Sequence, residues 1–119
     1  MKWWERVLGG PEEVGLPPPT LFGFVRIGTN PRVITPPIEL EKALELVETW
    51  VARPNTRVLA PGARHLEIAF GLLRTAGTAG NLTTDAQLAA YAIENSATLY
   101  SCDTDFARFH NVAWKNPLK

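Results

Sequence analysis

Short apolar runs of β type alternate along this chain with longer segments of helical period, and prolines and glycines separate them. The predicted strands are 13–16, 57–60, 98–101 and 112–114. The predicted helices are 3–8, 21–29 with Thr20 as a possible N-cap, 39–51, 61–76, 85–95 and 106–109. Strands that alternate with helices predict an α/β fold with a mostly parallel sheet.

The length of 119 residues predicts a single domain over 1–119. Twelve Lys and Arg residues balance twelve Asp and Glu residues, so the chain does not hold nucleic acid through its net charge. Contact with RNA or DNA would need a local patch or a metal ion. A single cysteine, Cys102, excludes an internal disulfide and a multi-cysteine zinc site. No apolar stretch suits a signal peptide or a membrane span, so we expect a cytoplasmic protein without membrane contact.

Three aspartates are placed where an α/β sheet binds ligands. Asp103 and Asp105 directly follow the predicted strand 98–101, and ligands bind at the carboxyl ends of parallel strands. Asp85 opens the preceding predicted helix, near a positive helix end. Three converging carboxylates suit hard cations such as Mg²⁺ or Mn²⁺. A cation held in this way can activate water and stabilise charge on a phosphoryl group.

Simpler interpretations of the same residues stay open. Asp85 could only complement the helix dipole, and Asp103 and Asp105 could cap the helix at 106–109. A hydrolytic triad of Ser101, Asp103 and His110 lacks the G-x-S-x-G turn that such a nucleophile needs. For His65, next to Arg64, we expect a solvated position on the surface.

Two stretches carry a specific resemblance. Residues 80–93 read GNLTTDAQLAAYAI and residues 97–109 read ATLYSCDTDFARF, and FVRIGTNPR at 24–32 and WKNPL at 114–118 accompany them. In this order they resemble PIN domains, and among these the VapC-type ribonuclease toxins of bacterial toxin–antitoxin pairs. The resemblance covers essentially the whole chain.

The resemblance implies a three-layer α/β/α fold and an endoribonuclease that hydrolyses RNA phosphodiesters with Mg²⁺ or Mn²⁺. Asp85 matches the acid of the family's D-A-x-L-A-A helix, and Asp103 and Asp105 match the acids of its D-x-D-F turn. The three aspartates are thereby implied as the catalytic metal ligands. The implied partners are the RNA substrate, a VapB-type antitoxin and a second copy of the chain in a homodimer.

One family feature has no counterpart in this sequence. Family members begin with a strand that carries an aspartate and lies at the centre of the sheet, followed by a first helix. We therefore expect an N-terminally incomplete PIN-like domain that lacks this central strand, with impaired nuclease activity. The alternative function is a catalytically inactive remnant that only binds an antitoxin or a PIN partner. A flavodoxin-like domain, the third alternative, finds no support in the order of the motifs.

Overall fold

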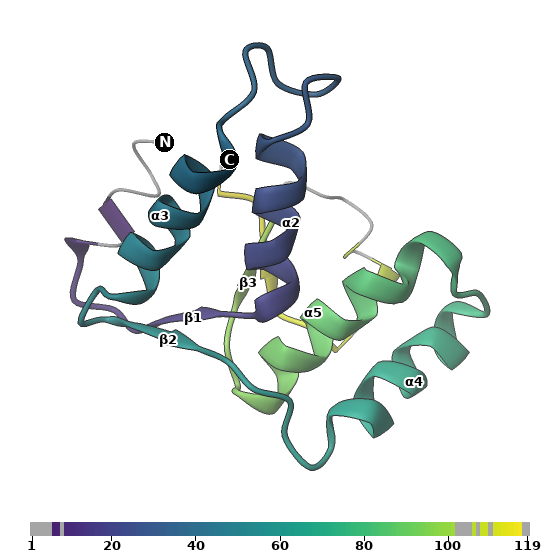
Figure 1. Ribbon diagram of the computed structural model, residues 1–119. Coiled ribbons are helices and arrows are strands. Elements are labelled where there is room, and N and C mark those ends of the chain that lie inside the picture. Colours follow the sequence, from purple (N-terminus) through teal and green to yellow (C-terminus); the bar gives the residue numbers. More distant parts are fainter. Residues whose placement is uncertain (1–5, 8, 102–105, 107, 110, 118–119) are drawn as a thin grey trace. The chain divides into compact units, whose positions relative to one another are not determined.

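The computed structural model describes residues 6–7, 9–101, 106, 108–109 and 111–117 (Figure 1). Contacts divide the chain into two compact units, residues 1–59 and 60–119. The strands are β1 (Val14–Leu16), β2 (Thr56–Val58), β3 (Leu99–Tyr100) and β4 (Trp114–Lys115). The helices are α2 (Pro18–Gly28), α3 (Leu40–Val51), α4 (His65–Ala76), the short 3-10 helix η1 (Gly80–Leu82) and α5 (Thr83–Glu94).

Both described strand pairs are parallel, which confirms the predicted α/β class. They form two two-stranded ladders, β1 with β2 in the first unit and β3 with β4 in the second. The predicted helix at 3–8 falls mostly outside the described residues, and so does residue 107 of the predicted helix at 106–109. In the described part of the chain, no helix is long and apolar enough to cross a membrane.

In the first unit, the turn before β2 organises the segment before β1. The backbone N–H of Val14 donates to the carbonyl of Asn55 at 2.7 Å, and Val14 then pairs with Thr56. The side-chain Nδ2 of Asn55 lies 3.0 Å from the carbonyl oxygen of Val7 and 3.0 Å from that of Glu12. One amide side chain therefore holds the chain that leads into β1.

Helix α2 begins at Pro18, three residues earlier than the predicted helix at 21–29, so the interpretation of Thr20 as its N-cap is wrong. Pro17 is the N-cap, and prolines occupy the first two helical positions. Proline fits there because the N–H that it lacks would have no intrahelical partner in the first turn. The carbonyl of Pro17 accepts the first helical hydrogen bonds, from Thr20 at 3.0 Å and Leu21 at 3.4 Å.

Helices α2 and α3 pack against each other through an aromatic pair. The rings of Phe24 and Trp50 meet edge to face, with their centroids 4.8 Å apart. The apolar residues of α3 are covered unequally: Ala43 is fully buried, while Leu40 and Leu44 remain exposed. The predicted helix at 39–51 is therefore confirmed, but only part of its apolar face is covered in the structure.

In the second unit, α4 and α5 form the wall of a small hydrophobic core. Ala86 and Ala89 of α5 are fully buried, and their small side chains allow α4 to approach closely. The buried members of this core cluster are Leu72, Leu82, Ala86, Ala89, Phe106 and Phe109. Leu99 of β3 and Trp114 of β4 pack against the same cluster.

Helix α4 differs from its prediction in its start and in its buried face. It begins at His65 rather than at residue 61, and it buries His65, Ala69 and Leu72. Leu66 and Phe70, two of the larger apolar residues of this helix, are 63% and 48% exposed. The face of α4 that is buried is the one that contacts α5, and it does not carry all of the largest apolar side chains of the helix. Helices pack through the face whose shape fits the neighbouring helix.

Candidate functional site

Asp85 lies in the first turn of α5, at the third helical position. The helix begins at Thr83, two residues before the predicted start, because the 3-10 turn Gly80–Leu82 leads directly into it. The hydroxyl of Thr83 donates to the carbonyl of Gly80 at 2.9 Å and fixes this junction. A half-buried carboxylate in the first turn is favoured by the positive end of the helix dipole.

The predicted acidic turn, residues 102–105, carries Asp103 and Asp105, and the chain that enters it is held at the end of β3. The N–H of Ser101 donates to the carbonyl of Lys115 at 3.1 Å, so the parallel ladder extends to Ser101. The indole Nε1 of Trp114 donates to the carbonyl of Ser101 at 2.9 Å. Trp114 therefore fixes the last described residue before Asp103, a role that the sequence analysis did not predict.

Phe106, directly after the acidic turn, is anchored in the core. Its side chain is 2% exposed and belongs to the core cluster together with Leu82 and Ala86. Ala86 is the immediate neighbour of Asp85 in the chain. Asp103 and Asp105 themselves, like Cys102, Thr104 and His110, lie outside the described residues.

Replacement of Trp114 by phenylalanine tests how firmly the end of β3 is held. Trp114→Phe keeps a half-buried aromatic ring but removes the indole N–H, so the Ser101 carbonyl loses its side-chain donor. We expect the free energy of unfolding to fall by about 1 kcal/mol, the usual contribution of one hydrogen bond. Urea denaturation measures this change. Equal free energies of unfolding for the variant and the wild type would show that a water molecule replaces the indole N–H as donor without loss of stability.

The three predicted ligands, Asp85, Asp103 and Asp105, are of a residue type that fits a hard divalent cation. Aspartate oxygens are the ligands that Mg²⁺ and Mn²⁺ prefer in proteins. Asp85 is the one predicted ligand in the described part of the chain, where no group of three His, Cys, Asp or Glu residues gathers at a metal-binding distance. A complete set would therefore need Asp103 and Asp105.

His65 is buried, so the prediction of a solvated surface histidine is wrong. It is 6% exposed, and its ring lies against that of Tyr91 with centroids 4.6 Å apart. Its Nδ1 is 3.8 Å from Oε1 of Glu94 and has no hydrogen-bond partner among the described residues. The spacing of His65 to Ala69 and Leu72 was the available signal, because residues i, i+4 and i+7 share one helix face.

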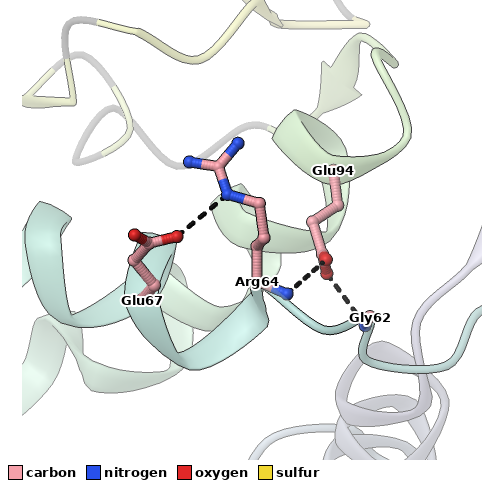
Figure 2. A network of polar contacts seen from close by, with 4 residues as sticks. All are labelled: Gly62, Arg64, Glu67 and Glu94. Carbon is pink, nitrogen blue, oxygen red and sulfur yellow. Dashed lines mark hydrogen bonds and ion pairs between the residues drawn. The ribbon is translucent and has the colours of Figure 1, made fainter.

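Glu94, at the end of α5, fastens the loop that leads into α4. Figure 2 shows its carboxylate between the loop and α5. Its Oε1 accepts the N–H of Gly62 at 2.9 Å, and its Oε2 accepts the N–H of Arg64 at 3.2 Å. These two bonds hold the backbone of the loop directly before α4, which begins at His65.

Comparison with known proteins decides the family. The PIN domain family matches residues 1–112. Ribonuclease VapC33 of Mycobacterium tuberculosis is 49% identical over 117 residues, which are 98% of this chain and 82% of that protein. The chain belongs to the VapC group of the PIN-domain family. The resemblance predicted from the motifs is therefore confirmed.

Solved structures show the same fold for this VapC-type PIN domain. A chain of VapBC-1 from nontypeable Haemophilus influenzae matches with a TM-score of 0.70 and 18% identity, over 98% of this chain and 85% of that chain. A chain of VapBC2 from Rickettsia felis, bound to a DNA fragment from its promoter, matches with a TM-score of 0.67 and 19% identity, over 93% and 80%.

Proposed function

We propose that this VapC-type PIN domain is a metal-dependent endoribonuclease toxin that hydrolyses RNA phosphodiesters, acting as one domain over 1–119. Asp85, Asp103 and Asp105 hold the Mg²⁺ or Mn²⁺ ion. The observation that carries the proposal is the anchoring around the acidic turn. Ser101 before the turn is held by Trp114, and Phe106 after it belongs to the core cluster that contains Ala86, next to Asp85.

The chain's own residues supply position and charge in this function. A bound divalent cation neutralises charge on a phosphoryl group and promotes attack by water. Asp85 is carried on a regular helix, and a rigid element positions a ligand more accurately than a free loop. Ser101 is held by the indole of Trp114 and Phe106 by the core cluster, so the described residues on both sides of Asp103 and Asp105 are fixed.

The partners belong to the same proposal. The related solved structures are VapBC assemblies, which supports a VapB-type antitoxin as the partner of this chain. The homodimer and the cytoplasmic location that we expect from the sequence stay predictions.

An RNA cleavage assay with controlled metal tests the activity. We expect the purified chain to cut single-stranded RNA in Mg²⁺ or Mn²⁺. Cleavage should stop in excess EDTA and resume when the metal is restored, because the proposed reaction depends on a bound cation. Asp85→Asn, purified in parallel, controls for contaminating nucleases and should cut at least about 100-fold more slowly.

Three outcomes contradict the proposal. Cleavage that persists in EDTA would refute the dependence on metal, and equal cleavage by Asp85→Asn would assign the activity to a contaminant. A folded chain that never cuts RNA but still binds a VapB-type antitoxin would favour the alternative function, a binding-only remnant.

A further inference from the structure

A cavity of about 450 Å³ opens on the second unit, between α4 and the described residues Arg108, Phe109 and Asn111. Its charged lining residues are Arg64, Glu67 and Arg108, and Ile68, Ile93 and Phe109 contribute apolar surface. This volume is within the range of small-molecule and nucleotide sites. Two arginines against one glutamate leave the lining with a net positive charge, so the cavity favours an anionic group.

Arg64 is oriented for such a group by Glu67. Its Nε donates to Oε2 of Glu67 at 2.9 Å, and in Figure 2 the two terminal nitrogens point away from Glu67. The hydrogen bond and the charge of Glu67 raise the pKa of Arg64 above its ordinary value, so the guanidinium remains charged. The glutamate thus uses one donor of the fork, and the terminal nitrogens remain for a ligand oxygen.

Arg108 provides the second cation from a different element. Its side chain is exposed, and it forms no ion pair with any residue in the described part of the chain. The neighbouring Phe109 is 4% exposed and belongs to the core cluster, which anchors this short segment. Arginine is the residue best suited to phosphate, because its planar fork matches two phosphate oxygens.

We propose that this cavity is a subsite for one nucleotide of single-stranded RNA, in which Arg64 and Arg108 bind a phosphate and the apolar lining contacts the base or sugar. This inference rests on the proposed nuclease function and adds a substrate contact outside the three aspartates. Single-stranded RNA suits such a cavity, since its bases are free to leave a stack and lie against apolar or guanidinium surfaces.

The place of Arg108 in the chain connects the cavity with the acidic turn. Arg108 follows Asp105 by three residues, and three residues span at most about 11 Å. One RNA strand can therefore contact both regions. In this arrangement the subsite determines where the strand lies relative to the carboxylates, and Arg64 and Arg108 are positioning residues rather than catalytic ones.

RNA binding without cleavage tests the subsite. Fluorescence anisotropy of a labelled oligouridylate, with the full chain in EDTA, measures the affinity over a range of salt concentrations. We expect Arg64→Ala and Arg108→Ala each to weaken binding about three- to tenfold and to lower the slope of log K against log salt by about 0.7. Glu67→Gln should strengthen binding, because it removes the negative charge from the lining.

Arg74→Ala is the matched control, since Arg74 is exposed on the same helix α4 but does not line the cavity. It should bind RNA as the wild type does. Thermal melts monitored by circular dichroism confirm that the variants fold, which we expect because the side chains of Arg64 and Arg108 are exposed.

Three results would overturn the subsite. One is unchanged RNA binding by both arginine variants while the wild type still cuts RNA, which leaves the nuclease function intact. Another is displacement of the RNA by millimolar inorganic phosphate at matched ionic strength, which would identify a pocket for free anions. The third is a wild-type chain that neither binds nor cuts RNA, which refutes the nuclease function as well.

Discussion

Asp103→Asn is expected to lower RNA cleavage by at least about 100-fold. Loss of a residue that only supports a metal ligand typically costs 10- to 100-fold in affinity or activity, and loss of a ligand itself costs at least as much. Asparagine keeps the shape of the side chain but removes the negative charge that a divalent cation requires. The chain contains three aspartates in all, and each of them is a proposed ligand.

Binding of Mn²⁺, followed by electron paramagnetic resonance, gives a second readout of the same substitution. The Asp103→Asn variant should bind Mn²⁺ more weakly, while its metal-free form should melt at or above the temperature of the wild type. The melting temperature should not fall, because three carboxylates that share the proposed metal site would repel one another when no cation neutralises them. A loss of cleavage through unfolding would instead lower the melting temperature.

Glu41→Gln serves as the matched control for Asp103→Asn. Glu41 is an exposed acidic residue in the first turn of α3, so its neutralisation removes one carboxylate that is not among the three proposed ligands. We expect unchanged cleavage and Mn²⁺ binding. Wild-type cleavage by Asp103→Asn would remove Asp103 from the proposed ligand set.

Gly62→Ala is expected to destabilise the second unit by about 1–3 kcal/mol, the cost of losing a hydrogen bond to a charged group. A methyl group at Gly62 would overlap the carboxylate of Glu94, lying 2.9 Å from its Cδ and closer still to Oε2. The carboxylate is the end of a flexible side chain. The Glu94 side chain is only 14% exposed, however, and its carboxylate accepts two backbone N–H bonds. It can move aside only by breaking those bonds.

Gly71→Ala provides a control of opposite sign within the same unit. Gly71 lies inside α4, and an added methyl group there meets nothing within 4 Å. Alanine at this position should stabilise the helix by up to about 1 kcal/mol. Urea denaturation of both variants measures the two effects under identical conditions.

A double-mutant cycle with Glu94→Ala separates the proposed cause from a general effect of alanine in the loop. Truncation of Glu94 removes the carboxylate that the new methyl group would displace. The cost of Gly62→Ala should therefore largely disappear in the Glu94→Ala background, since residues in direct contact are not additive. An equal cost in both backgrounds would show that the overlap with Glu94 is not the reason.

Local patterns were enough to predict most of the secondary structure and the family. β-type runs predicted β1 and β2, and helical periods predicted α2 to α5, because side-chain periodicity is a property of each segment alone. Errors occurred at helix starts. α2 begins earlier because its prolines fit the first turn, and α4 begins later, after a loop whose backbone is bonded to the distant carboxylate of Glu94.

For the candidate site, the sequence by itself determined which residues we propose as metal ligands: three aspartates, one at a helix start and two after a strand. Only the tertiary structure decided which residues support them and which face of α4 is covered. His65 is buried because Tyr91 and Glu94 of α5 lie against it, and the carbonyl of Ser101 is held because Trp114 pairs beside it. Such contacts join residues that are 13 to 29 positions apart in the chain, beyond the reach of any local pattern.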